Sequence, residues 1–387
     1  MSSAKSGRLK ILAIHKIASV GSNRMKARDY SLRGEGTKHA IEAGLVAANW
    51  YHSDVPRSQM KELMRRSDSQ AIKDTILLYG CMIALASMGL YLWPTWWSAP
   101  CWLAYGVLYG SASDSRWHEC GHGTAFKTRW MNDLVYEIAS FMIMRNSVVW
   151  RWSHARHHTD TYIVGHDPEI AIMRPPKIWS LVLRFFGLSD IKQYLISMLR
   201  QAFVGLNAEE SCYVPNDQIP KVVLVARISS VIYGATLALS VYNASILPLM
   251  FIGLPRLYGA WHHIMTGLLQ HGGLAENVLD HRLNSRTVYM NPISGFIYWN
   301  MNYHVEHHMF PMVPYHALPK LHAMIGNDLP PANKSIYAAF AEMVPAIWRQ
   351  RSDPDYYLRR ELPESAKPYR IDLHEGALGR LPDLVTK

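Results

Sequence analysis

Histidines at regular spacing are the residues of this sequence best suited to chemistry. The chain has 19 histidines, and three short segments hold eight of them in the patterns HxxxH, HxxHH and HxxHH. The eight are His118, His122, His154, His157, His158, His304, His307 and His308. Residues three or four apart share one face of a helix, so each segment can present its imidazoles to a metal ion. Chance would supply roughly 0.05 HxxHH matches at this histidine frequency, which favours metal binding over separate structural roles.

A ninth histidine extends this set. We predict His271 as a further ligand, because it falls at the end of an apolar stretch where the three clusters are expected to converge. Imidazole binds zinc, copper, iron and nickel, so ligand type alone does not choose the metal. Eight or nine nitrogen donors exceed what one ion coordinates, which indicates two ions with four or five ligands each.

Metal-bound imidazoles also need partners for their second ring nitrogen. We predict Asp160, Asn302 and Glu306 in this role from their closeness in sequence, although each could equally be a solvated polar residue. Other candidates at similar spacing are Asp167, Glu119 and Asn300. We exclude Cys120 as a ligand, because two positions beyond His118 a helix has turned by about 200°.

The composition limits what can position these histidines. With 49% hydrophobic and 18% charged residues, the chain is too apolar for disorder. A mean hydropathy of -0.06 indicates that any membrane-embedded part is a minority. Four cysteines in 387 residues cannot form a disulfide framework. We expect the formal charge of +10 to suit anionic lipid and an acidic partner protein, and expect no nucleic-acid partner.

A stretch without charged residues runs from Thr75 to Ser113. As a helix it would measure about 58 Å, enough for two crossings of a hydrocarbon core of about 30 Å. Pro94 lies in its middle among tryptophans that favour the membrane interface, and so predicts the turn of a hairpin. The alternative is a buried helix pair in a soluble protein.

A second apolar hairpin is predicted from about Val222 to Leu269, and we expect Pro255 to kink its second arm. Its only Lys, Arg, Asp or Glu residues are Arg227 and Arg256. A charge at membrane depth is costly and therefore a functional candidate. We predict that Arg256 binds a charged group of the substrate, the alternative being a structural ion pair.

The charge distribution predicts an orientation. Both hairpin tips are uncharged, whereas lysines and arginines crowd the other ends, which places the histidines and both termini in the cytoplasm. Residues 178–204 are amphipathic and are expected to lie along the inner interface. The predicted fold is therefore an all-α integral membrane protein, with four transmembrane helices in two hairpins and a cytoplasmic helical cap that carries the histidine clusters. A bacterial inner membrane is the expected location.

Three regions follow from this reading. Residues 1–50 are predicted as a basic, flexible N-terminal extension, because the first 40 residues are rich in lysine and arginine. Residues 51–325 form the membrane domain with the metal site. Residues 326–387 are predicted as a polar cytoplasmic C-terminal tail.

The order of these features resembles a known family. Three histidine boxes, two intervening hairpins and the sequence NYHVEHHMFP at 302–311 look like the membrane-bound fatty acid desaturase and hydroxylase superfamily. The resemblance covers roughly residues 60–325. It implies a non-haem di-iron centre whose ligands on this chain are the eight box histidines. His271 is similar to an extra ligand that the related alkane monooxygenases place on a late span.

The resemblance implies O2-dependent oxidation of an unactivated C–H bond in a lipid-like substrate. Fatty acyl desaturation is the first expectation, and hydroxylation of an alkane, fatty acyl or other small apolar substrate is the alternative. The chain has no HPGG haem-binding signature. Electrons would therefore come from a separate ferredoxin, rubredoxin or b-type cytochrome with its reductase.

Two unrelated functions fit part of the sequence. His118-Glu119-Cys120-Gly121-His122 also matches HExxH, the motif of zinc proteases that use the glutamate as a general base. That reading, a zinc membrane protease, leaves both HxxHH segments unused. A metal transporter would place ionisable groups along a membrane path instead of confining them to one side.

Overall fold

The computed structural model describes residues 28–370, which fold into helices without a β-strand. Two isolated β-bridges join Thr287 to Tyr303 and Val288 to Asn333. The prediction of an all-α fold is thus confirmed for the described part of the chain. Most of the basic N-terminal extension and the end of the predicted tail lie outside the described residues.

The helices vary widely in length, and α3 and α10 are the longest of those described. The α-helices are α1 Glu35–Glu42, α2 Arg57–Leu63, α3 Asp68–Tyr91, α4 Ser98–Val107, α5 Ser113–Gly121, α6 Arg129–Met142, α7 Ser147–Thr159, α8 Ile178–Phe185, α9 Leu188–Phe203, α10 Ile219–Tyr242, α11 Leu247–Phe251, α12 Pro255–Tyr258, α13 Ala260–His271, α14 His281–Asn284, α15 Pro292–Ile297, α16 His304–Met309, α17 Leu318–Ile325 and α18 Ile336–Arg349. A π-helix, η1 Leu108–Ala112, joins α4 to α5, and the 3-10 turns are η2 Glu210–Cys212, η3 Asn216–Gln218, η4 Tyr315–Ala317 and η5 Gly326–Asp328.

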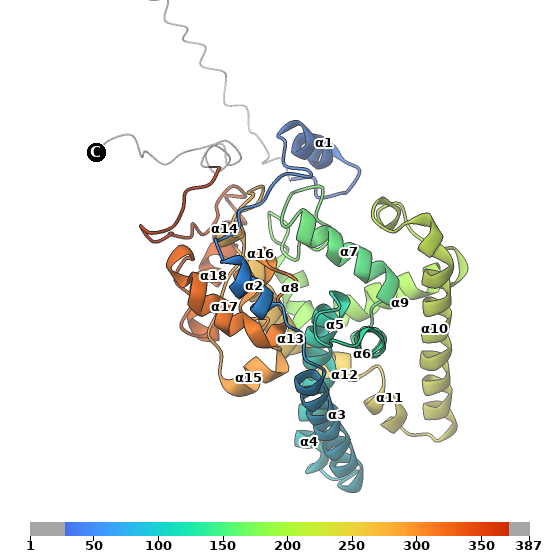
Figure 1. Cartoon of the computed structure of the whole chain (residues 1–387). Helices are drawn as coiled ribbons and strands as arrows, with labels where there is room; N and C mark the ends of the chain where they lie inside the picture. The colour runs from blue at the N-terminus through green and yellow to red at the C-terminus, as the bar shows by residue number, and fades with distance from the viewer. Residues whose placement is uncertain (1–27, 371–387) are drawn as a thin grey trace, which may run out of the picture.

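The first predicted hairpin is formed by α3 and by the continuous run of α4, η1 and α5. Ser67 caps α3 by accepting a hydrogen bond from the backbone amide of Gln70. Gly89 lets the arms meet, since a Cβ there would lie 2.9 Å from the indole of Trp102. Figure 1 shows α3 and α4 side by side, extending away from the rest of the molecule. The opposite face of α3 is apolar and exposed, with Ile83 67% exposed.

The second hairpin departs from its prediction. Its first arm, α10, is one helix of 24 residues, but the expected kinked second arm is three separate helices, α11, α12 and α13. The breaks occur where Gly253 adopts a positive φ of 96° and where Pro255 and Gly259 begin new helices. The prediction of one long arm was therefore wrong. The described chain contains two segments long and apolar enough to span a membrane, 57–91 and 216–242.

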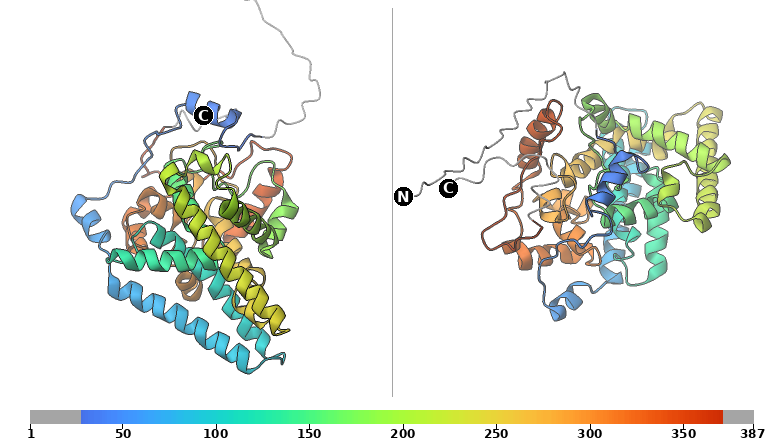
Figure 2. Two further views of the ribbon diagram at one scale, coloured as in Figure 1. Left: turned by 90° about the vertical axis from the view of Figure 1, so that its right-hand side faces the viewer. Right: turned by 90° about the horizontal axis from the view of Figure 1, so that it is seen from above.

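The two hairpins point the same way. In Figure 1 and the left view of Figure 2, the turn after α3 and the turn after α10 lie at the same end, whereas α7 and α16 lie towards the other. The hairpins approach closely where Gly259 faces Gly106, because a Cβ on Gly259 would lie 2.0 Å from the carbonyl carbon of Gly106. This contact brings α12 against α4 and fixes the chain just before α13.

The amphipathic segment 178–204 forms α8 and α9, as its pattern predicts. Gly187 joins the two helices with a positive φ of 67°. Large apolar side chains on both helices are exposed, including Trp179, Leu199 and Phe203. An exposed apolar face of this kind suits contact with lipid at an interface.

Parts of both predicted appendages belong to the folded body. Arg28 forms an ion pair with Glu276, and Tyr30 donates to the same carboxylate at 2.9 Å. In the predicted tail, Met343 of α18 packs in a buried cluster with Leu268 and Leu269 of α13. The described ends of the chain therefore hold the end of α13, and with it His271, in place.

Candidate metal centre

Four elements deliver the nine predicted ligands. The helix α5 carries His118 and ends at its C-cap His122, while α7 and α16 carry the two HxxHH segments, and His271 is the last residue of α13. Asn146 starts α7 by accepting hydrogen bonds from the amides of Val148 and Val149. The expected helical spacing is thus realised, and the imidazoles converge in two groups. Within each group, all donor atoms lie within 4.8 Å of one another.

The first group combines all three histidine boxes. It contains His118, His122, His154, His158 and His307. Their Nε2 atoms are neighbours: those of His118 and His307 lie 2.7 Å apart, those of His154 and His118 lie 3.1 Å apart, and those of His122 and His158 lie 3.1 Å apart. Donors at about 2.1 Å from one ion, at right angles, would be about 3 Å apart. These spacings therefore suit a common ion.

The second group contains His157, His271, His304 and His308. The Nε2 atom of His304 lies 3.0 Å from that of His271 and 3.0 Å from that of His308. His157 faces this group although its neighbours His154 and His158 face the first. The nine predicted ligands are therefore brought together as five and four, the division that the donor count suggested.

Two carboxylates fix the tautomer of ligands on α7. The Nδ1 atom of His157 lies 2.8 Å from Asp167 Oδ2, and that of His154 lies 3.1 Å from Glu169 Oε2. A carboxylate accepts the Nδ1 proton, which leaves the Nε2 lone pair directed into the cluster. Converging lone pairs repel one another unless a cation lies between them, so the donor set fits a pair of bound metal ions.

Neutral acceptors act in the same way in the second group. The Nδ1 atom of His271 lies 2.8 Å from the carbonyl oxygen of Asn284. The Nδ1 atom of His308 lies 3.2 Å from the hydroxyl of Thr161, which itself donates to the carbonyl oxygen of His157 at 2.6 Å. Because the Thr161 proton is already used, its oxygen is free to accept from His308.

Burial keeps most of these imidazoles neutral. It lowers the pKa of His122, His158 and His307 well below the usual value, and neighbouring histidines add to the effect. At His157, burial also disfavours the charged form, but the Asp167 carboxylate outweighs it and raises the pKa. Neutral imidazole is the form that binds metal.

The three predicted partner residues, Asp160, Asn302 and Glu306, contact other groups, so this prediction was wrong. Asp160 contacts His166 at 3.4 Å, Asn302 donates to the carbonyl oxygen of Val288, and Glu306 accepts a hydrogen bond from Thr287 and contacts His322. They are adjacent to the boxes in sequence, but the residues they contact belong to neither imidazole group. Asp167 was a lesser candidate, and Glu169, Thr161 and Asn284 were missed because loops bring them to the ligands.

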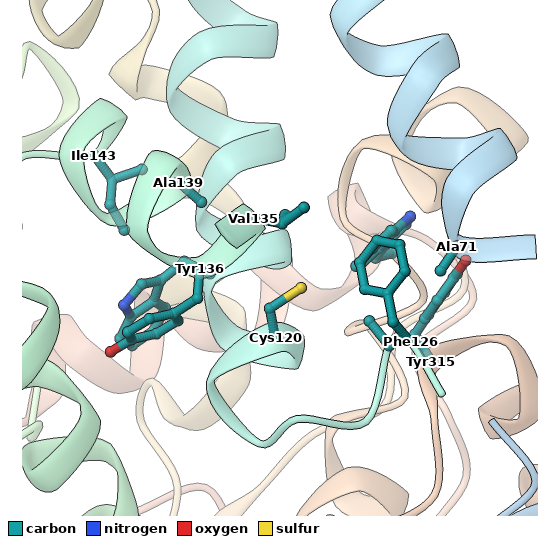
Figure 3. Packing of buried hydrophobic residues seen from close by; sticks show 11 residues of the cluster. Ala71, Cys120, Phe126, Val135, Tyr136, Ala139, Ile143 and Tyr315 are labelled. Carbon is teal, nitrogen blue, oxygen red and sulfur yellow. The ribbon is translucent and has the colours of Figure 1, made fainter. Parts of the chain in front are cut away.

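Packing accounts for two residues near the centre. Cys120 belongs to neither imidazole group and packs in a buried cluster with Val135 and Tyr136, in agreement with its exclusion as a ligand (Figure 3). His281 lies outside both imidazole groups. It is buried, stacked on the indole of Trp50 at 4.3 Å between ring centroids, and its ring centroid lies 5.0 Å from that of His308.

A cavity of about 430 Å³ adjoins the centre. Three predicted ligands line it: His118, His154 and His157. It extends past Trp117 and Trp150 to α9, and inward to Arg256 on α12. The volume is in the range of pockets that hold small organic molecules.

Helical hairpins that present two clusters of buried imidazoles beside a cavity define a protein with a candidate site for two metal ions, and sequence comparison identifies its family. The chain belongs to the fatty acid desaturase family, whose model matches residues 91–340. It is 25% identical over 275 residues to a chloroplastic omega-3 fatty acid desaturase of Glycine max, covering 65% of this chain and 58% of that protein.

Other relatives carry related names. An acyl-lipid omega-3 desaturase (cytochrome b5) of the endoplasmic reticulum of Arabidopsis thaliana is 23% identical, over 65% of this chain and 69% of that protein. An sn-1 oleoyl-lipid 12-desaturase of Synechocystis sp. is 31% identical over 30% of this chain and 32% of its own. The chain thus spans between about a third and about two thirds of the length of these relatives.

Proposed function

We propose that this protein introduces a double bond into a fatty acyl-type substrate, using two histidine-bound iron ions, O2 and two electrons. The observation that carries the proposal is the convergence of nine imidazoles in groups of five and four. Membership of the desaturase family supports iron as the metal, which the donor set alone leaves open.

In this proposal each imidazole group holds one ion. The first iron would be held by His118, His122, His154, His158 and His307, and the second by His157, His271, His304 and His308. When bound, iron supplies the one-electron chemistry with O2 that amino-acid side chains lack. Asp167 and Glu169 hold the ligand imidazoles in the required tautomer, and the adjoining cavity holds the acyl chain beside the centre.

The overall reaction is balanced by an external reductant. The substrate loses one hydrogen from each of two adjacent carbons, O2 accepts these two hydrogens together with two protons and two electrons, and two water molecules form. The chain's role is to orient the two carbons towards the centre and to exclude bulk water. Small changes in that orientation decide between two outcomes. Loss of a second hydrogen gives the double bond, whereas addition of an oxygen atom to the first carbon gives an alcohol.

We propose four membrane crossings. The arms α3 and α10 are long and apolar enough to span, and their partners would be α4 with η1, and α11 to α13. The uncharged tip between α3 and α4 exposes Trp96 at 92%, which suits the outer interface. The centre and the described ends would then face the cytoplasm, in a bacterial inner membrane.

The electron donor is proposed to be a separate cytoplasmic protein. A ferredoxin, a rubredoxin or a b-type cytochrome could serve, and one relative bears cytochrome b5 in its name. The formal charge of +10 favours an acidic donor, because opposite charges speed association.

Two alternatives receive less support. Hydroxylation is less favoured because the relatives are named as desaturases. The zinc protease reading requires Glu119 to act on a metal-bound water. That carboxylate is buried, accepts hydrogen bonds from Thr124 and from the amide of Tyr315, and belongs to neither imidazole group. No comparable feature favours a transporter.

The test combines metal analysis with product analysis. Purified protein is expected to hold two iron ions per chain and, with a reductase, a donor protein and O2, to convert components of a lipid extract into products lighter by two hydrogens. Products heavier by one oxygen atom would show that the reaction is hydroxylation and not desaturation. A single zinc ion per chain, with no lipid product, would overturn the proposal.

A further inference from the structure

Arg256 is a buried cation that has no ion-pair partner in the part of the chain that the structure describes. The residue is 3% exposed, and its Nη1 atom is buried without a hydrogen-bond acceptor. No carboxylate of residues 28–370 lies within ion-pair distance of it. Leaving a guanidinium unpaired in a low-dielectric interior is unfavourable, so such a group is expected to meet an anion that the polypeptide itself does not supply.

The two carboxylates that act on Arg256 electrostatically already have other partners. Asp114 and Asp190 act on Arg256 through space. However, Asp114 lies 3.1 Å from Arg145 and 2.9 Å from His263, and Asp190 lies 3.6 Å from Arg184. These pairs leave Arg256 as an unmatched positive charge on the cavity wall.

Close helix packing holds this cation at the cavity. A Cβ on Gly110, within the π-helix η1, would lie 3.3 Å from Arg256 Nη1, so a glycine there leaves room for the guanidinium. Gly187, between α8 and α9, packs so tightly that its Cβ would lie 2.1 Å from the carbonyl oxygen of Arg256. Both sides of Arg256 are therefore shaped by residues without side chains, and π-helices of this kind are frequent at functional sites.

Arg256 and the metal centre share one cavity. The same volume of about 430 Å³ is lined by Arg256 and by His118, His154 and His157. A ligand with an acidic group on Arg256 would therefore lie with its carbon chain beside the imidazole groups. The planar guanidinium matches a carboxylate or phosphate through two parallel hydrogen bonds.

We propose that Arg256 binds the ionised end of the substrate, so that the protein acts on an acid with a free carboxylate or phosphate instead of an esterified acyl chain. The ester carbonyl of an acyl chain carries no charge and could not itself neutralise Arg256. This proposal rests on the proposed function for its reaction, but binding can be measured without turnover.

The experiment measures binding of three probes with the same tail to the full-length protein in lipid nanodiscs. The probes are tetradecanoate, tetradecyl phosphate and the neutral tetradecanamide, titrated calorimetrically against wild type, R256Q, R256K and R227Q. Arg227 is the matched control, because it also lies in the second hairpin but donates to the carbonyl oxygen of Ala202 and does not line the cavity.

We expect wild type and R227Q to bind at least one anionic probe tenfold or more tightly than the amide. R256Q should reduce this preference to about twofold without changing the affinity for the amide, and R256K should retain part of it. The stronger anionic probe identifies carboxylate or phosphate. Equal affinity for acid and amide in wild type, or an unchanged preference in R256Q, would overturn the proposal.

The proposed function can fail separately. An intact anion preference with no oxidised product from the lipid assay would reject the reaction and leave the Arg256 site standing. Desaturation of an esterified lipid with no anion preference would reject the Arg256 site alone.

Discussion

Asp167 offers the sharpest test of how the imidazoles are oriented. Its side chain is fully buried and receives three contacts: His157 Nδ1 at 2.8 Å, the amide of Tyr162 at 2.7 Å and the amide of Glu169 at 2.7 Å. Substitution by asparagine preserves the size but removes the charge and replaces one acceptor oxygen with a donor. At least one of the three contacts is then lost.

The expected loss of metal affinity follows from the hydrogen bond between His157 and Asp167. A hydrogen bond to a charged group is worth about 1.5–3 kcal/mol, which corresponds to about 10- to 100-fold in an equilibrium constant. D167N is therefore expected to weaken binding of the second metal ion by about 10- to 100-fold, the range typical of residues that orient metal ligands. The iron retained per chain should fall towards one.

A control exists seven positions away. Asp160 is also buried, but its nearest imidazole is His166, which belongs to neither group. The assay loads metal-free protein with Fe2+ without oxygen, adds increasing chelator and measures iron by mass spectrometry. D160N should match wild type within about twofold. Similar losses in both variants, or none in D167N, would refute the argument that Asp167 acts through His157.

Three further predictions concern the centre, the fold and the membrane. H157A should abolish product formation and lower bound iron while the protein remains inserted and folded, as checked by metal analysis and size-exclusion chromatography; full activity would contradict its assignment. G259V should lower the free energy of unfolding by about 1–3 kcal/mol or more, because a Cβ at this position lies 2.0 Å from Gly106. An unchanged Tm would show that the helices can separate there without loss of stability. A cysteine replacing Trp97 should react with an impermeant thiol reagent only from outside the cell, and one replacing Lys367 only after lysis; labelling of both from one side would reject the proposed topology.

The local histidine patterns were predictable because they depend on helical periodicity alone. Spacings of three and four residues place side chains on one face in any helix, so each box could be read as a metal-binding surface before its position was known. The exclusion of Cys120 rests on the same geometry. Apolar length likewise predicted α3 and α10, since a run without charges extends a helix regardless of its neighbours.

Features that depend on loops were not accessible in this way. Asp160 was preferred to Asp167 by closeness in sequence, yet the turn after α7 directs Asp167 and Glu169 towards the imidazoles and Asp160 away from them. The second arm of the second hairpin was expected to be one helix, because single glycines and prolines within an apolar run do not reveal how sharply the backbone breaks. The described part of the predicted tail contains α18, which packs on α13. The polar composition of this region did not predict that helix.

The sequence by itself determined which nine histidines form the candidate ligand set, and their number predicted two ions, because donor type, number and helical phase are local properties. Only the tertiary structure decided how the nine divide, with His307 joining the first two boxes and His157 leaving its neighbours for His271. It also decided that Arg256 shares a cavity with three of them and has no ion-pair partner within residues 28–370. Such assignments depend on how separate helices cross, and crossing is set by close contacts such as Gly106 with Gly259 that have no periodic signature in the sequence.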